Sequence, residues 1–222
     1  RPERAQGGCV VSARGRKRAA PVEVEAYADA EFYPTPASAI QPIIDSPLLV
    51  LPGGRWIDPC VGTGRIPSAI NASRPDISWL LCDIDERHRP HIEGVMRNGD
   101  ELLPFGDFVN RAWTHERAAV SAFNPPFSLA LAFVLASMER AHEVLMLQRL
   151  NWFGTKQRSV WLARHCPDVY VLPERPSFTS DGGTDSAEYA WFHWPTSEER
   201  RCGQIAVLDN PRQSSLFGAV SP

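Results

Sequence analysis

The sequence has little that would mark a membrane, secreted or metal-dependent protein. No apolar run reaches the length of a membrane-spanning helix, and no signal-peptide pattern is present. The five cysteines are odd in number and none belongs to a CxxC pair, which argues against a disulfide framework or a zinc site. His88 and His91 lie three apart near Cys82, but a polar helix face explains this spacing better than a metal site. We therefore expect no bound metal and a reducing, cytoplasmic location.

Net charge is also small, at −3 over 222 residues, so the chain as a whole gives no sign of nucleic-acid binding. The charge is unevenly distributed, however. Residues 1–20 hold six Arg or Lys residues against Glu3 alone, a net of +5, which leaves −8 for the rest of the chain. A basic arm on an acidic body is typical of a nucleic-acid tether. A solvated tail that only aids solubility is the alternative.

What the sequence does have is enough apolar residue, 43%, to bury the core of one α/β domain. Hydrophobic runs and turn residues predict strands at 55–58, 78–82, 107–109, 118–123, 143–147, 168–172, 188–194 and 204–208. They predict helices at 35–45, capped by Thr35 with Pro36 in the first turn, and at 64–73, 86–98, 128–140 and 152–165. Alternating strands and helices indicate a mostly parallel, doubly wound sheet, and the late strands without helices add an antiparallel edge. We expect a flexible arm at 1–30, the main domain at 31–200, and a strand and tail at 201–222.

A glycine-containing turn follows the first predicted strand, from Asp58 to Gly64 (DPCVGTG). Glycines let a backbone approach a ligand closely, and the helix that follows presents free N–H groups. Pro67 stands where a dinucleotide-binding turn would have its third glycine, which disfavours a nicotinamide-linked oxidoreductase. The Asp58 carboxylate would repel a pyrophosphate and attract a cation. S-adenosylmethionine carries both an ammonium and a sulfonium.

Acidic residues also follow the second predicted strand. Asp83 ends it, and Asp85 comes two residues later. This is the position from which an acid in such a sheet binds ribose hydroxyls. We expect Asp83 to take that role, and a helix cap is the alternative.

The tetrapeptide Asn124-Pro125-Pro126-Phe127 directly follows the strand predicted at 118–123. The two prolines restrict the backbone, so the Asn124 side chain and the Pro125 carbonyl are held as hydrogen-bond acceptors. Two acceptors aimed at one NH₂ group would draw its lone pair out of conjugation and free it for attack on a methyl sulfonium. Phe127 offers a face on which a flat base stacks. The pattern indicates methylation of a planar amino group, by orientation and electrostatics rather than by a strong base.

The two motifs, in this order and separation, resemble those of amino-group methyltransferases, particularly the small adenine-specific DNA methyltransferases of phages and prophages. The resemblance covers about residues 31–195 and includes Tyr33-Pro34-Thr35-Pro36, Arg175–Phe178 and Tyr189–Phe192. It implies a Rossmann-like class I methyltransferase fold with a seven-stranded sheet, in the cytoplasm of a bacterial or phage-infected cell. It implies that Asn124, Pro125, Pro126 and Phe127 are catalytic and that S-adenosylmethionine is bound by Tyr33, Thr35, Pro36, Asp58, Pro59, Gly62, Gly64, Asp83 and Asp107.

The sequence departs from this family in two respects. No segment is large enough for a full target-recognition domain, so specificity is low or comes from a dimer partner, a recognition partner or the basic arm. Cys60 and Val61 also replace the residues most common in the turn, a change that we expect to be tolerated because the backbone does the binding.

Other functions stay open. Adenine in RNA and a glutamine amide in protein present the same planar NH₂ to the tetrapeptide, and a non-catalytic nucleic-acid-binding protein could retain the fold. The basic arm and the family-like ending favour DNA as the partner, and intact Asp58 and Asn124 favour an enzyme.

Overall fold

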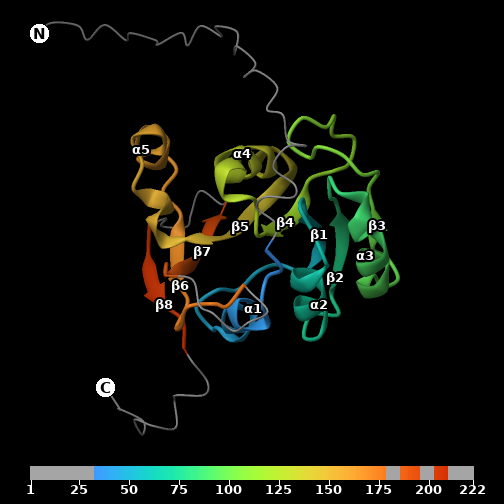
Figure 1. Cartoon of the computed structure of the whole chain (residues 1–222), viewed down its shortest axis with the longest axis horizontal. Helices are drawn as coiled ribbons and strands as arrows, with labels where there is room; N and C mark the ends of the chain where they lie inside the picture. The colour runs from blue at the N-terminus through green and yellow to red at the C-terminus, as the bar shows by residue number, and fades with distance from the viewer. Residues whose placement is uncertain (1–32, 179–185, 196–202, 210–222) are drawn as a thin grey trace, which may run out of the picture.

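Eight strands form one sheet in the part of the chain that the computed structural model describes, which is residues 33–178, 186–195 and 203–209 (Figure 1). The predicted arm at 1–30 and most of the predicted tail lie outside these ranges. The strand order is β3-β2-β1-β4-β5-β7-β6-β8. The strands are β1 (Gly54–Asp58), β2 (Ile77–Leu81), β3 (Glu101–Leu102), β4 (Ala118–Phe123), β5 (Ala141–Arg149), β6 (Asp168–Val171), β7 (Tyr189–Pro195) and β8 (Ile205–Val207).

The sheet is mostly parallel, as expected. Only β7 is antiparallel to its neighbours, β5 and β6, so antiparallel pairing is confined to one side of the sheet. The strand count is eight rather than the seven that the family resemblance implies, because the short β8 pairs in parallel with β6 and extends the sheet.

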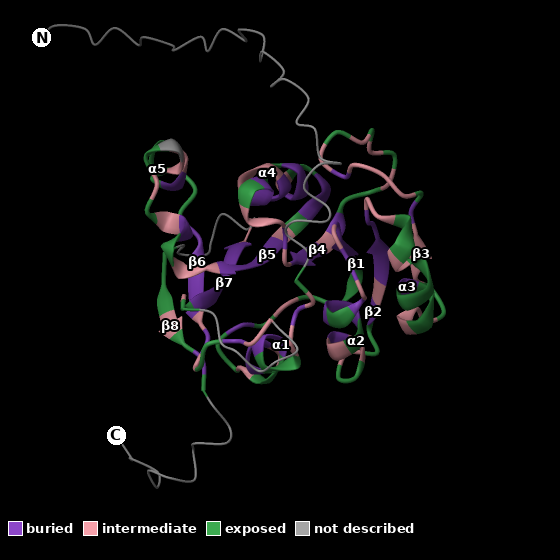
Figure 2. Cartoon of the chain, in the orientation of Figure 1, coloured by how far each residue is buried: buried purple, intermediate pink, exposed green. Residues whose placement is uncertain are grey.

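Helices cover both faces of the sheet (Figures 1 and 2). They are α1 (Ala37–Asp45), α2 (Arg65–Asn71), α3 (Arg89–Val95), α4 (Ala130–Arg140) and α5 (Lys156–Leu162), with 3₁₀ turns η2 (Glu86–His88), η3 (Phe127–Leu129) and η4 (Leu150–Phe153). Side chains of β5 alternate between the two hydrophobic cores: Leu145 and Leu147 pack with α1 and α2, and Val144 and Met146 pack with α4. No helix in the described ranges is long and apolar enough to cross a membrane.

The predicted strand at 107–109 is wrong. The Asp107 carboxylate accepts a hydrogen bond from the backbone N–H of Val109 at 2.8 Å and another from the Asn110 side chain, which closes a turn instead. Gly106 has a φ of 146°, a conformation that a strand residue with a side chain would avoid. The strand that pairs with β2 is the shorter β3, six residues upstream at Glu101–Leu102.

Two predicted helices are shorter than expected and are interrupted. The helix predicted at 86–98 begins as η2, continues as α3 from Arg89 with Pro90 in its first turn, and ends at Val95. The helix predicted at 152–165 is split into η4 and α5 around Gly154 and Thr155. The first helix occurs as predicted, but Thr35 does not cap it: the N-cap position is Pro36, and no side chain bonds the helix N-terminus.

Because these strands are parallel, the two predicted motifs lie at the same edge of the sheet, the one formed by the C-terminal ends of the strands. Asp58 pairs with Leu81 across β1 and β2, and Phe123 pairs with Met146 across β4 and β5. The C-terminal ends of these strands, where both motifs begin, are therefore neighbours. The Trp191 indole N–H donates to the Ala39 carbonyl at 2.8 Å, which fixes α1 to β7 and places Thr35 at the same edge.

Candidate functional site

One pocket lies at this edge, with an empty volume of about 970 Å³ that includes the part open to solvent. Three strand ends and the segment before α1 form its wall. Eleven of the thirteen residues predicted from the sequence line it, namely Tyr33, Thr35, Asp58, Pro59, Gly62, Asp83, Asp107, Asn124, Pro125, Pro126 and Phe127. Pro36 and Gly64 do not line it. The structure thus places the two motifs, 60 residues apart in the chain, around one space.

The turn after β1 is shaped by two glycines with positive φ, 53° at Gly62 and 74° at Gly64. A Cβ on Gly64 would lie 2.5 Å from a methyl group of Val95, so this glycine permits close packing of α2 on α3. The turn is tied to β2 by the Val61 N–H, which donates to the Cys82 carbonyl at 3.0 Å. Gly62 therefore shapes the pocket wall directly, and Gly64 supports it from behind.

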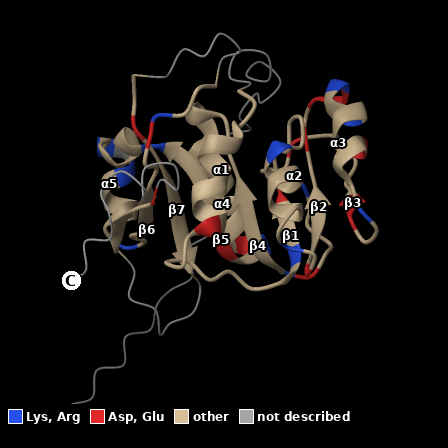
Figure 3. Cartoon of the chain, turned by 90° about the horizontal axis from the view of Figure 1, so that it is seen from below, with Lys and Arg blue, Asp and Glu red and all other residues tan. Residues whose placement is uncertain are grey.

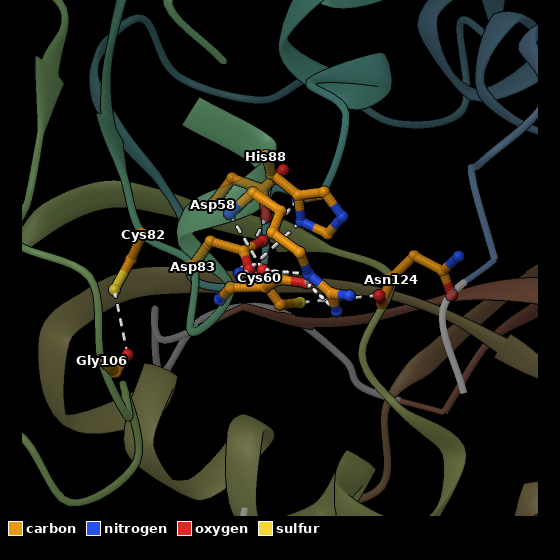
Figure 4. Close-up of polar contacts among 10 residues, drawn as sticks. Asp58, Cys60, Cys82, Asp83, His88, Gly106 and Asn124 are labelled. Carbon is orange, nitrogen blue, oxygen red and sulfur yellow. Dashed lines mark hydrogen bonds and ion pairs between the residues drawn. The ribbon is translucent and has the colours of Figure 1, made fainter. Parts of the chain in front are cut away.

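Asp83 is the hydrogen-bonding centre of the pocket (Figure 4). One carboxylate oxygen accepts from the Gly62 N–H at 2.6 Å. The other accepts from the Asp85 N–H at 2.8 Å and lies 3.4 Å from Nδ1 of His88. Asp83 thus fixes the glycine turn as well as facing the pocket, so its proposed ribose contact would add to an existing structural role.

Asp58 is 1% exposed and lies beside Asp83. Burial raises the pKa of the Asp58 carboxyl well above its usual value, the Cys60 N–H that donates to it opposes this, and the charge of Asp83 raises the pKa further. Burying two acids side by side costs free energy that a bound cation would recover. The two carboxyl groups therefore suit the ammonium of S-adenosylmethionine and would repel a phosphate.

His88 is a lining residue that sequence reasoning missed. Its bond to Asp83 raises the pKa of the imidazole, and Asp85 adds to this effect while Arg87 and partial burial oppose it. Its position on the predicted helix gave no sign of this contact, because η2 and α3 meet at a bend there. Within the described ranges, no group of three or more His, Cys, Asp and Glu side chains could hold a metal ion.

Asn124 is oriented by Thr35, a residue that is distant from it in the sequence. Its side-chain Nδ2 donates to the Thr35 hydroxyl at 3.0 Å, across 89 positions of sequence. Its Oδ1 is buried and has no hydrogen-bond partner among the described residues. An amide oxygen that is desolvated and unpaired is costly unless a donor from outside the chain reaches it. The geometry therefore supplies a fixed acceptor at the pocket wall.

The Cys60 thiol links the two motifs, because its Sγ donates to the Asn124 carbonyl at 3.5 Å. Burial raises the pKa of this thiol well above its usual value, and the charges of Asp58 and Asp83 raise it further. The thiol is therefore held in its protonated form, as a donor rather than a nucleophile.

Aromatic rings flank Phe127 beside the pocket. Tyr33 stacks on it with ring centroids 6.0 Å apart, and Tyr189 is tilted at 6.3 Å. The Arg149 guanidinium lies over the Phe127 ring at 4.3 Å, and its Nε donates to the Tyr189 hydroxyl at 3.1 Å. Tyr33 is 42% exposed, so part of this cluster meets solvent.

The loop that carries Asp107 is held by a buried arginine. The Arg140 guanidinium, at the end of α4, donates to the carbonyls of Phe108, Val109 and Arg111. It also lies over the Phe108 ring at 4.3 Å, and Phe108 lines the pocket. A single cation thus replaces strand pairing in holding this loop against the sheet.

No protein-family model matches the sequence, and no curated protein matches it. Solved structures share its fold. The methyltransferase subunit of a type I restriction-modification system from Streptococcus thermophilus has a TM-score of 0.59 at 12% identity, covering 79% of this chain and 47% of that one. A protein from Listeria monocytogenes assigned as a class I S-adenosylmethionine-dependent methyltransferase has a TM-score of 0.57 at 14% identity, covering 81% and 64%. One from Pyrococcus horikoshii assigned as an RNA methyltransferase has a TM-score of 0.54 at 14% identity, covering 74% and 87%.

These likenesses establish the fold. The chain has the Rossmann-like class I methyltransferase fold, as the sequence predicted. It spans less than two thirds of the length of the S. thermophilus and L. monocytogenes proteins.

The buried acid predicts how one substitution changes stability. Because the folded-state pKa of Asp58 is raised above its unfolded value, stability falls as pH rises from about 4 towards the folded pKa. Asp58→Asn removes this loss and keeps an oxygen for the Cys60 N–H. We expect the ligand-free variant to gain about 1 kcal/mol or more over the wild type at about pH 8, and no comparable gain at about pH 4. Urea unfolding at both pH values measures this, and an equal or lower stability at pH 8 would contradict it.

Proposed function

We propose that this chain binds S-adenosylmethionine and transfers its methyl group to the exocyclic amino group of adenine in DNA. The observation that carries the proposal is the buried, unpartnered Oδ1 of Asn124, held at the pocket wall by Thr35. It needs a donor, and an amino group of a flat base is a donor of suitable shape. Asp58 and Asp83, which line the same pocket, suit a cationic cofactor, so the pocket offers groups for both the methyl donor and the acceptor.

When bound, the cofactor supplies a methyl group on a positively charged sulfur. The chain's own residues then orient the acceptor. Asn124 Oδ1 and the Pro125 carbonyl would accept hydrogen bonds from the two amino hydrogens, which turns the nitrogen lone pair away from the ring. The freed lone pair would take the methyl group that the cofactor supplies, and the resulting cationic amine would release its proton to water. Orientation is the main contribution, so no strong base is required.

Other residues would position the two partners. Asp58 would face the ammonium and Asp83 the ribose hydroxyls. Tyr33, Thr35, Pro36, Pro59, Gly62, Gly64 and Asp107 would complete the cofactor site, with Pro36 and Gly64 acting behind the wall. DNA is favoured over RNA and protein by the basic arm at 1–20 and by the family-like ending of the sequence. The S. thermophilus relative in fold belongs to a restriction-modification system, which agrees with DNA as the substrate.

The direct test is methyl transfer from radiolabelled S-adenosylmethionine to duplex DNA, RNA and bulk protein, followed by nucleoside analysis. We expect label as methylated adenine from DNA. Label in RNA or in glutamine would keep the chemistry and replace the substrate. Tight cofactor binding in calorimetry with no label in any acceptor would favour a non-catalytic protein that retains the fold, and the absence of cofactor binding would refute the proposal.

Asn124→Ala should reduce turnover strongly, by roughly 100-fold, because the amino group loses its fixed acceptor. Cofactor affinity should stay within a few-fold of the wild type. Thr35→Val should reduce turnover less, because it only releases the Asn124 amide. Asn98→Ala, at an exposed position, is the control. Steady-state kinetics and calorimetry separate the two effects, and unchanged turnover in Asn124→Ala would remove this residue from the mechanism.

Cofactor affinity should rise as pH increases through the raised pKa of His88, between about pH 6.5 and about pH 8, because loss of the imidazolium charge makes the pocket more negative towards a cation. Asp58→Asn should weaken binding at about pH 8, because it removes a negative charge that would face the ammonium. His88→Gln keeps a donor for Asp83 but does not titrate, so it should flatten the pH profile. His91→Gln, on the exposed side of α3, should not. Calorimetry at several pH values decides this, and a flat wild-type profile would contradict it.

A further inference from the structure

The segment that links β5 to β6 is basic. Residues 144–167 contain Arg149, Lys156, Arg158 and Arg164 and no acidic residue, although the chain outside residues 1–20 has a net charge of −8. Figure 3 shows only basic residues on α5, whereas α3 at the other end of the sheet carries both signs. Four cations and no acidic residue within 24 positions give this segment a net positive charge on an otherwise acidic body.

This positive charge begins at the rim of the candidate site. Because β5 is parallel to β4, it ends at the same edge from which Asn124 emerges. Arg149 is the last residue of β5, and its guanidinium lies 4.3 Å from the centre of the Phe127 ring. Then η4 and α5 continue outward from that point, and Lys156 is exposed at the start of α5. Arg149 therefore lies beside a residue that lines the pocket, and Lys156 and Arg158 follow it within nine positions of the chain.

Two of the arginines are held in place before any partner binds. Arg149 is stacked on Phe127 and bonded through Nε to Tyr189. Arg158 lies over the Trp152 ring at 5.0 Å, and its Nε donates to the Trp152 carbonyl at 2.9 Å. In both cases Nε, the guanidinium nitrogen nearest the main chain, takes part in the anchoring. A guanidinium fixed in this way loses less side-chain entropy when it meets an anion, and its planar shape suits a phosphate.

We propose that Arg149, Lys156 and Arg158 form a phosphate-contact row that holds a nucleic-acid backbone beside the base presented to Asn124. The inference rests on the proposed function and names the surface through which its substrate would be held. Phosphates carry regularly spaced negative charge and need no sequence-specific contact, so such a row gives affinity without specificity. An acidic protein partner is the competing occupant.

The test uses the full chain and a short fluorescent DNA duplex, with affinity measured by anisotropy over a series of salt concentrations. Lys156→Gln/Arg158→Gln removes two contacts, so the slope of log affinity against log salt should fall by about 1.8, with affinity at low salt weakened roughly tenfold. The matched control is Arg55→Gln/Arg74→Gln. These arginines lie near the starts of β1 and β2, at the opposite edge of the sheet, and Arg74 lies over Trp56 at 5.7 Å as Arg158 does over Trp152.

The slope distinguishes a phosphate contact from a structural effect, since lost packing changes affinity without changing the number of released ions. Lys156→Gln alone, at an exposed position, should lower the slope by about 0.9 and serves if the double variant unfolds. Equal slopes in wild type and variants, an equal fall in the control, or competition by an acidic polypeptide as effective as DNA would overturn the proposal. Methyl transfer to DNA with unchanged slopes would overturn this surface alone, whereas an altered slope without methyl transfer would refute the proposed function and retain the surface.

Discussion

Two buried carboxylates at neighbouring strand ends impose the main constraint on this structure. Asp58 and Asp83 are 1% and 5% exposed, and each must be compensated for the water it has lost. The compensation comes from backbone N–H groups of Cys60, Gly62 and Asp85. The Cys60 and Gly62 donors point inward because the chain turns sharply after β1, where Gly62 has a positive φ. The pocket wall is therefore the arrangement that allows two acids to be buried together.

The Asn124 side of the pocket depends on contacts between residues that are distant in sequence. Asn124 is oriented by Thr35, which lies before α1, and α1 is fixed to β7 by the Trp191–Ala39 hydrogen bond. The antiparallel β7 thus reaches the candidate site indirectly, through a helix on one face of the sheet. On the other face, Arg140 holds the loop that carries Asp107. Both faces must be folded before the amide and the acids meet around one space, which couples the site to the stability of the whole sheet.

The sequence predicted the parts of the fold that depend on local pattern. Strands with buried apolar runs were found with small errors at their ends, and β4 was predicted with the same bounds as observed. The strand predicted at 107–109 failed because Asp107 bonds its own backbone, a contact that competes with strand pairing. The two motifs and the acidic residues at strand ends correctly predicted most of the residues that line the pocket. The role of Thr35 as a partner of Asn124 and that of His88 as a partner of Asp83 were missed, because both depend on tertiary contacts that no local pattern encodes.

An acidic pocket would repel the polyanionic substrate of the proposed function, and the proposed cofactor would reduce that repulsion. A cationic cofactor would offset the charge of Asp58 and Asp83, so a phosphate backbone would approach the rim more easily when the cofactor is present. Transfer of the methyl group would leave a neutral sulfur, and the pocket would become more negative again. The buried carboxylates would respond strongly to this change in charge on the sulfur, because the effective dielectric around them is low. The exposed basic residues of α5 would respond weakly, because solvent and salt screen them from it. With Asp58 and Asp83 buried and the basic residues outside the pocket, the charged cofactor would bind before the nucleic acid. After transfer, the more negative pocket would bind both products more weakly.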